Sequence, residues 1–468
     1  MSTPHTVFQN RRALKFFRTL ILFLIAVALV SCVFRNKQIV TATTTTESVV
    51  VLDPTTALPL TGTFQTINNG PGNQLDAHVD GDLASYFNDY FDNDLNRRIW
   101  TIRYFDFATN TDRKVPTNGR VFHSDVSGDR ISFIEEDDPW SGPHVIVFDS
   151  LSQTRTVVPG FGHQKTSLGN NVVAFEERTY VPASNWFLEE GEIGVYDLGS
   201  GTVTSLTNDD QFDFQPAVSP TGNVIAWTKC QTDQSGCDIS TAIRTAPGVF
   251  NTQALTGTLG EEGSPRTNGQ LVVYVSTRNG ERDIYYQRVA GGAETHLSIP
   301  GEQRSPNISG NLISFESETP GGYFDVFVYD INTAKLYQVT NTPGFIELLS
   351  DISVWNGTAR VVYALTAPVG FDLFAFTFAV PDSAEEQIND LTELVESFDL
   401  PPGTENSLTS KLQNAIAALQ ASDTATACSC LTAFINECQA QSGKKLTTAQ
   451  ATQLINSASQ IKIDLGCQ

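Results

Sequence analysis

The stretch that decides the fold comprises SPNISGNLISFES (305–317), FDVFVYDIN (324–332) and KLYQVT (335–340). In its first part, Ile313 and Phe315 alternate with polar residues, and this period of two is typical of a half-buried strand. Residues that favour tight turns, such as Gly, Asp and Asn, separate the apolar runs. The stretch therefore predicts one small sheet of four short antiparallel strands.

The same unit recurs along the chain. The aromatic residue of its second strand is repeated as Tyr86, Phe133, Phe175, Trp227, Tyr274, Phe315 and Tyr363. Neighbouring members of this set are 41 to 52 residues apart, and each follows a turn that contains a glycine. Four-stranded units of about 40–50 residues indicate a β-propeller. We therefore expect residues 59–380 to form a propeller of seven blades, or of six if one irregular unit is not a blade. A β-sandwich or a β-solenoid is the alternative.

The last unit, from Ser350 to Phe378, contains three strand-like runs instead of four. A fourth run, GTFQTIN (62–68), stands before the first unit. Pairing of this run with the last unit would close the ring and remove the free edges of an open array. We therefore expect Phe64 to Ile67 to be the outer strand of the blade that contains Tyr363.

The N-terminus has the layout of an export signal. Residues 1–18 contain four basic residues and no acidic one, and an apolar run follows. That run ends at Leu29-Val30-Ser31-Cys32, which resembles the bacterial lipobox, whose cysteine carries a diacylglycerol. We expect residues 1–32 to be an export signal with lipidation at Cys32; ordinary cleavage and an uncleaved anchor are the alternatives.

The Thr-rich segment 33–58 is predicted to be a tether between this anchor and the propeller. The expected location is therefore that of an exported bacterial lipoprotein, anchored to a membrane in the periplasm or on the cell surface. The net charge of −23 at pH 7 argues against nucleic acid as a partner.

Cys230 and Cys237 flank a polar loop between two predicted strands, a spacing at which a disulfide can close a hairpin. Such a cysteine pair could also bind a metal, but no second pair or histidine cluster completes a site with it. We therefore expect a disulfide at this position, and no metal site or cofactor.

After Pro381 the apolar residues change to helical spacing, as in Leu408, Leu412 and Ile416. Residues 381–468 are therefore expected to form a small α domain of four helices. This part contains four cysteines, Cys428, Cys430, Cys438 and Cys467.

Two of these cysteines, Cys430 and Cys438, lie in one predicted helix with about 12 Å between their Cα atoms, which is too far for a disulfide. Cys428 begins the third predicted helix and Cys467 ends the fourth. These two ends meet if the helices are antiparallel. We therefore expect a disulfide between Cys428 and Cys467.

Two family resemblances follow. The repeat resembles the TolB-like, WD40-like β-propeller family, most clearly in LVVYVSTRNGERDIYY (271–286), which implies the fold but no particular function. The segments NSLTSKLQNAIAALQ (406–420) and LTAFINECQAQSGKKLTTAQATQLI (431–455) resemble the FIMAH domain attached to secreted bacterial proteins. The second resemblance implies a location outside the cytoplasm and no activity.

Four polar residues, His78, Asp125, Ser167 and Asp351, are predicted near the innermost strands, where they could line the central channel. They could form a catalytic set, but solvation of strand ends is the simpler explanation. The sequence contains neither a GxSxG nucleophile motif nor an HExxH metal motif. We therefore predict no catalytic residue.

The expected function is that of a non-enzymatic binding or scaffolding protein outside the cytoplasm, which recognises a protein or peptide through the propeller. The alternatives are a propeller enzyme, such as a glycan lyase or hydrolase, and a carbohydrate-binding module; both would use the central channel. Convergent carboxylates or a metal in the channel would favour the enzyme, and a flat apolar patch on one face would favour the binding protein.

Overall fold

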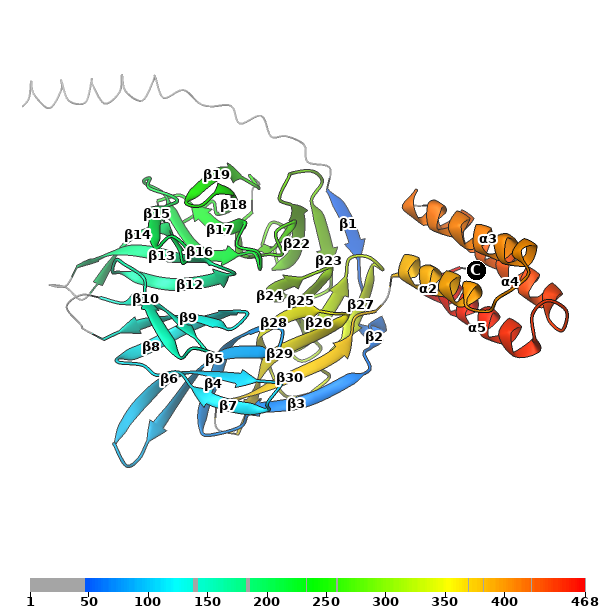
Figure 1. Cartoon of the computed structure of the whole chain (residues 1–468). Coiled ribbons are helices and arrows are strands. Elements are labelled where there is room, and N and C mark those ends of the chain that lie inside the picture. The colour runs from blue at the N-terminus through cyan, green and yellow to red at the C-terminus, as the bar shows by residue number, and fades with distance from the viewer. Residues whose placement is uncertain are drawn as a thin grey trace, which may run out of the picture. The chain divides into compact units, whose positions relative to one another are not determined.

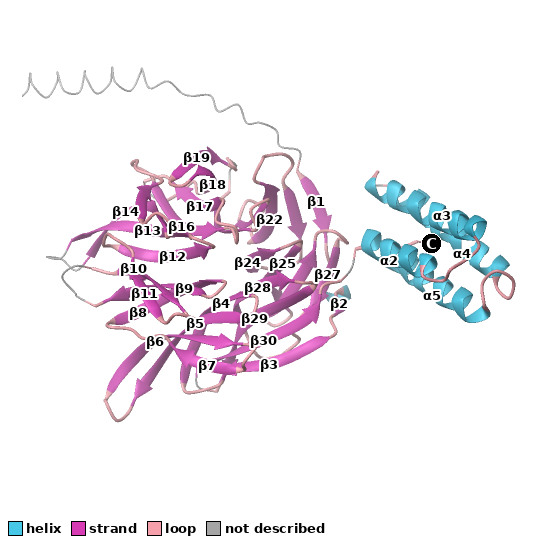
Figure 2. Cartoon of the chain, in the orientation of Figure 1, coloured by secondary structure: helices cyan, strands magenta, loops and turns pink. Residues whose placement is uncertain are grey.

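The computed structural model describes residues 47–137, 142–181, 186–232, 234–257, 260–368, 370–381, 383–421 and 423–467. Strands fill most of the chain up to residue 379, and four helices follow (Figures 1 and 2). The predicted fold class, a mainly β propeller followed by a small α part, is confirmed. Cys32 and the predicted export signal lie outside the described residues.

The strands repeat in sets of four that are paired in antiparallel fashion. The first strands are β4 (Gly72–Asp80), β8 (Arg120–Ser127), β12 (His163–Gly169), β16 (Phe212–Val218), β20 (Glu262–Thr267), β24 (Gln303–Ser309) and β28 (Glu347–Trp355). The second strands are β5 (Leu83–Asp92), β9 (Arg130–Glu136), β13 (Val172–Val181), β17 (Val224–Cys230), β21 (Leu271–Ser276), β25 (Leu312–Thr319) and β29 (Thr358–Ala367).

The outer half of each set is formed by the third and fourth strands. The third strands are β6 (Arg97–Asp106), β10 (His144–Asp149), β14 (Trp186–Asp197), β18 (Asp238–Ala246), β22 (Asp283–Arg288), β26 (Tyr323–Asp330) and β30 (Gly370–Ala379). The fourth strands are β7 (Thr111–Lys114), β11 (Thr154–Val157), β15 (Thr202–Ser205), β19 (Val249–Ala254), β23 (Thr295–Ser298), β27 (Lys335–Gln338) and β3 (Gly62–Asn68).

The first strands form a closed ring. Each contacts the first strand of the next set, and β28 contacts β4. By hydrogen bonding, however, the strands make six sheets, because a two-residue parallel pairing of β30 with β4 joins the last set to the first. The choice between seven and six blades depends on whether this joined sheet counts as two blades or one, so the blade number stays a prediction.

The aromatic residues that mark the repeat form the cores between neighbouring sets. All seven are at least 96% buried. Tyr86, for example, packs in one cluster with Val362 and Leu373 of the last set. Burial of such a large side chain stabilises the fold by about 1.5–3 kcal/mol, which explains why an aromatic residue recurs at this position.

The N-terminal strand β3 supplies the outer strand of the last set, as predicted. It pairs with β30 in antiparallel fashion, with Phe64 opposite Phe376. Figure 1 shows blue β3 alongside orange-yellow β30. The predicted closure of the ring is therefore present in the structure.

The end of the predicted tether differs from expectation. Strand β1 (Ser48–Val51) pairs in parallel with β23, and the short β2 (Leu58–Pro59), which follows the 3-10 turn η1 (Pro54–Thr56), pairs in parallel with β27. The predicted Thr-rich tether, residues 33–58, thus pairs with the propeller from residue 48 onward. The outer strands of two sets leave backbone groups available, and a β-branched run such as Ser48–Val51 satisfies them.

The four helices are α2 (Ala384–Glu396), α3 (Pro402–Gln420), α4 (Thr424–Gln441) and α5 (Thr448–Asp464). Ser383 and Thr447 start α2 and α5 with capping boxes. The helices share one core, in which Leu391, Leu412 and Phe434 are buried. Among the described residues, no helix is long and apolar enough to cross a membrane.

Within the described ranges the structure contains two disulfides. Cys230 is joined to Cys237 at the end of β17, and Cys428 is joined to Cys467 in the helical part. Cys430 and the buried Cys438 are free thiols. The Cα atoms of Cys428 and Cys467 are 5.7 Å apart because α4 begins where α5 ends.

Candidate active site

A repeated bulge turns polar side chains towards the centre of the ring. In every first strand, the register with the second strand shifts once near the middle. Five of these bulges contain a non-glycine residue with φ between 49° and 55°, namely Asp76, His123, Gln215, Ser264 and Ser305. Bulges re-aim side chains, and residues held in this region of backbone space cluster at functional sites. The bulges therefore mark the centre of the ring as the candidate site.

A polar cavity of about 260 Å³ lies there. Residues from all the first strands line it, and they include His78, His123, Lys165 and Arg266. A second cavity, of about 90 Å³, shares His78 and Arg266 with the first and adds Asp351. The two cavities are the open part of the central channel.

The four predicted channel residues lie on four first strands. His78, Asp125 and Ser167 line both cavities, and Asp351 lines the smaller one. Three of the four, His78, Asp125 and Asp351, come together. The hydroxyl oxygen of Ser167 instead accepts a hydrogen bond from the backbone N–H of Val218, at 3.0 Å.

His78 is surrounded by three carboxylates. Its Nδ1 lies 3.4 Å from Asp351 Oδ2 and 3.7 Å from Asp125 Oδ1, while its Nε2 lies 3.8 Å from Asp76 Oδ1. Asp76 also lies 3.3 Å from Nδ1 of His123. We refer to His78 with Asp76, Asp125 and Asp351 as the His78 centre.

The carboxylates determine the protonation of the His78 centre. Burial favours the neutral form of His78, but the charge of Asp125 and the side chains of Asp351 and Asp76 outweigh burial and raise the pKa of His78 to about 10. Burial likewise opposes the charge of Asp76, but the imidazoles of His123 and His78 hold its pKa well below the usual range. At neutral pH the centre therefore contains the His78 imidazolium beside the ionised Asp76.

Backbone hydrogen bonds hold these carboxylates in place. Asp351 Oδ2 accepts a hydrogen bond from the N–H of Val79, and Asp125 Oδ2 accepts one from the N–H of Leu168, at 2.9 and 2.8 Å. Both bonds cross from one first strand to the next. Because the scaffold fixes each carboxylate through these bonds, one oxygen of each lies beside His78 without further ordering. This is the arrangement that electrostatic catalysis requires.

The charges in the channel are unevenly distributed around the ring. The three carboxylates come from β28, β4 and β8, which are consecutive in the ring, whereas Lys165 and Arg266 come from β12 and β20. Arg266 Nε donates to Asn307 Oδ1 at 2.8 Å. Within the described part of the chain, neither cation has a carboxylate within 4 Å. The channel therefore has an acidic side and a side with two unpaired cations.

Four channel residues were not predicted from the sequence: Asp76, His123, Lys165 and Arg266. A signal for the first three exists: each stands two residues before a predicted channel residue, as Asp76 does before His78. In a regular strand, residues two apart lie on one face, so these residues could have been added to the set. The bulge that brings Asp76 back towards His78 has no such signal.

Comparisons with known proteins support the propeller fold. No protein family model matches the sequence, and no curated protein matches it. Among solved structures, an acylaminoacyl peptidase from Pyrococcus horikoshii is 11% identical, with a TM-score of 0.50 over 66% of this chain and 52% of that chain. The β-propeller domain of the Trilobed protease from Pyrococcus furiosus is 13% identical, with a TM-score of 0.49 over 66% of this chain and 95% of that domain.

TolB from Acinetobacter baumannii is 14% identical, with a TM-score of 0.38 over 59% of this chain and 76% of that chain. The chain thus has the propeller fold. It spans about half the length of the acylaminoacyl peptidase. At these identities the likeness shows the fold alone.

These findings correct the prediction of a non-enzymatic binding or scaffolding protein. The similar propellers are mostly those of peptidases and do not favour a non-enzymatic protein. The channel also contains the convergent carboxylates that were expected of an enzyme. The sequence misled because Asp125 and Asp351 are 226 residues apart and meet only when the ring closes.

Proposed function

We propose that the protein is a hydrolase whose substrate binds in the central channel, with the His78 centre assisting cleavage. The convergence of three carboxylates on one imidazole beside a polar cavity carries this proposal. Clusters of titratable groups with shifted pKa values in a cavity are typical of active sites. Peptidases contain propellers of similar fold, which is compatible with the proposal but is not evidence for it.

The charges suggest a role for each group. Asp76 lines the larger cavity and is ionised, so it can accept a proton from an attacking water molecule. The His78 imidazolium can stabilise negative charge that develops on the oxygen of the cleaved bond. Asp125 and Asp351 are positioning residues, because they keep the imidazole charged and hold it between them.

Short peptides are the proposed substrates. A short peptide carries a positive amine and a negative carboxylate, and the channel offers carboxylates on one side and the unpaired Lys165 and Arg266 on the other. A neutral glycan has no charged group that could form an ion pair with either side of the channel. The cavity of about 260 Å³ suits a ligand of a few residues at most.

The test is hydrolysis of a panel of di- and tripeptides by the purified full-length protein, with neutral glycosides as a second panel. We expect peptide hydrolysis, and a decrease of at least about 100-fold in kcat/KM in Asp76→Asn. Asp129→Asn, which alters an exposed turn carboxylate, is the control and should leave the rate unchanged. Absence of peptide hydrolysis, or an active Asp76→Asn variant, would refute the proposal.

The proposed hydrolase acts outside the cytoplasm. Two disulfides suit an oxidising compartment. The lipobox-like sequence at Cys32 and the FIMAH-like helical segments agree with an exported, lipid-anchored protein. Replacement of Cys32 by Ser should abolish metabolic lipid labelling in cells, whereas Cys430→Ser should not. Labelling that persists in Cys32→Ser would remove the anchor from the proposal.

A further inference from the structure

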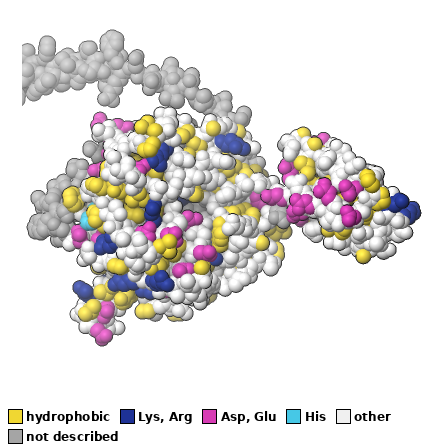
Figure 3. Space-filling model, viewed as in Figure 1, with side chains coloured by type: hydrophobic (Ala, Val, Ile, Leu, Met, Phe, Trp, Pro, Cys, Tyr) yellow, Lys and Arg dark blue, Asp and Glu magenta, His cyan; other side chains and the backbone are white. Residues whose placement is uncertain are grey.

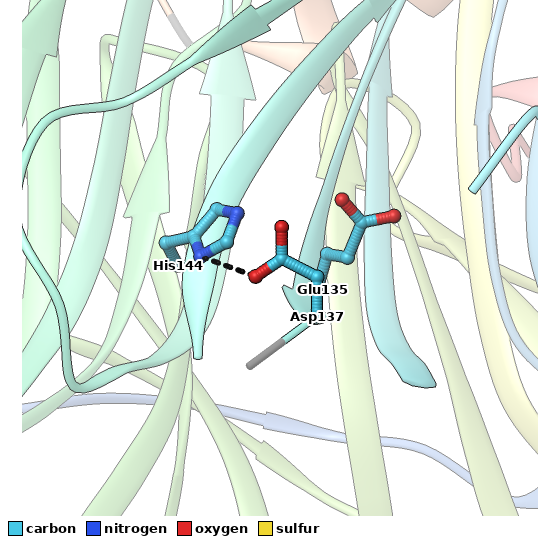
Figure 4. A group of neighbouring side chains, drawn as sticks. All are labelled: Glu135, Asp137 and His144. Atoms are coloured by element: carbon cyan, nitrogen blue, oxygen red, sulfur yellow. Dashed lines mark ion pairs between the residues drawn. The ribbon is translucent and has the colours of Figure 1, made fainter. Parts of the chain in front are cut away.

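A second cluster of ligand-type side chains lies at the end of the β9–β10 hairpin, away from the channel. Glu135 and His144 are directly opposite each other in the antiparallel pairing of β9 with β10. Asp137 follows Glu135 by two residues, which places both carboxylates on one face of the hairpin. One ligand atom from each of the three side chains lies within 4.8 Å of the other two (Figure 4).

The imidazole of His144 is the unusual member of this cluster. The residue is 94% buried, and its Nδ1 is buried without a hydrogen-bond partner among the described residues. The same nitrogen faces Asp137, with 3.9 Å between Nδ1 and Oδ1, as the dashed line in Figure 4 shows. A buried nitrogen lone pair without a donor is costly, and a bound cation would satisfy it.

Glu135 has outer partners of the kind that metal ligands have. It is fully buried, its Oε1 accepts the N–H of Asn118 at 2.6 Å, and its Oε2 accepts a hydrogen bond from Arg155. A carboxylate has about four lone-pair positions, so these two bonds leave room for a metal ligand bond. Glu135 and Asp137 together carry two negative charges, and Arg155 offsets one of them. A divalent cation would offset the other and leave a net charge of +1 at the site.

We propose that Glu135, Asp137 and His144 form a Zn²⁺ site. One imidazole nitrogen and two carboxylate oxygens suit Zn²⁺, whereas Ca²⁺ and Mg²⁺ prefer oxygen ligands only. Water would complete the tetrahedral coordination. The Asp137 side chain is 38% exposed, so the ion can reach the site from solvent. The site lies in a different place from the His78 centre and does not depend on the proposed hydrolysis.

The test is a calorimetric titration: the full-length protein is first treated with a chelator, and its binding of added Zn²⁺ is then measured. We expect one site that Asp137→Asn weakens at least tenfold, because one of three ligands loses its charge. Since Asp137 is partly exposed, this variant should remain folded. His144→Gln should abolish the same site. With Co²⁺ as the probe, the wild type should show visible absorption bands that both variants lose.

Glu136→Gln is the matched control, because Glu136 lies between the two carboxylates in sequence and points to the other face of β9. It should bind Zn²⁺ as the wild type does. Equal Zn²⁺ binding by the wild type and Asp137→Asn would overturn the proposal, as would the absence of binding. Binding of Ca²⁺ at this site in preference to Zn²⁺ would also overturn it.

Discussion

His78 shows how a single residue can serve both the fold and the site. Its imidazolium lies among the carboxylates of Asp76, Asp125 and Asp351, and it offsets charges that the closing of the ring would otherwise bring together unpaired. The same carboxylates bond to neighbouring first strands, as Asp351 does to Val79. The channel therefore cannot lose this cation without a cost to the ring.

Replacement of His78 by Gln should destabilise the protein in a pH-dependent way. The folded-state pKa of about 10 is above the ordinary value of 6.5, so the stabilisation is fully present below pH 6.5 and disappears as the pH rises towards 10. We expect His78→Gln to lower the free energy of unfolding by about 3–5 kcal/mol at pH 6, which is typical of breaking a buried ion pair. Denaturant unfolding of the wild type and the variant at several pH values measures this difference in unfolding free energy. If the difference does not decrease between pH 7 and pH 10, it does not come from the charge of His78.

At this scale, the sequence predicted positions better than contacts. His78, Asp125, Ser167 and Asp351 could be placed near the channel because their register recurs after each turn. The contact of Asp76 with His78 could not be predicted, since it needs a bulge at a non-glycine residue with φ of 54°. Glu135 and His144 were missed for a similar reason: their meeting depends on the hairpin register, which the turn determines.

Strand β3 is the element on which closure of the propeller depends. It brings Ile67 into the core shared by the first and last sets, beside Tyr86 and Leu373. Closure could be predicted because the last set visibly lacks a strand. The pairing of β1 and β2 could not, because parallel pairing at a sheet edge uses backbone groups and leaves almost no side-chain pattern.

Truncation of Ile67 should weaken the whole ring. Ile67 is 95% buried, and Ile67→Ala should cost about 2–4 kcal/mol, or about 3–8 °C in the melting temperature of the propeller. Thr63→Ala, at an exposed position of the same strand, should cost less than about 1 kcal/mol. Calorimetry of both variants decides the matter. If Ile67→Ala melts at the wild-type temperature, β3 does not hold the ring closed.

At the scale of the whole molecule, the described chain contains two kinds of core. The propeller has several clusters between neighbouring sets, whereas the helical part has one cluster built only from residues 384–465. On the propeller face seen in Figure 3, acidic and basic side chains are interspersed. Composition and periodicity could predict both parts. The function could not be predicted from them, because the site combines first strands that are far apart in sequence.

Removal of the disulfide in the helical part should affect that part alone. The double variant Cys428→Ser/Cys467→Ser opens a link across 39 residues, and we expect a loss of about 3–4 kcal/mol. In a part of this size, that is a decrease of about 10 °C or more in melting temperature. Calorimetry should show a separate transition that moves while the propeller transition stays. If the protein instead shows a single transition and the double variant shifts all of it, the two cores do not unfold independently.

Three carboxylates hold a charged imidazole in the channel, and NMR titration of histidine carbons in the ¹³C-labelled full-length protein can detect that charge. His78→Gln identifies the His78 signal among those of the six histidines. We expect this signal to stay that of an imidazolium up to about pH 10, and Asp351→Asn to shift its titration to lower pH. A His78 signal that titrates near pH 6.5, and does so equally in Asp351→Asn, would contradict it.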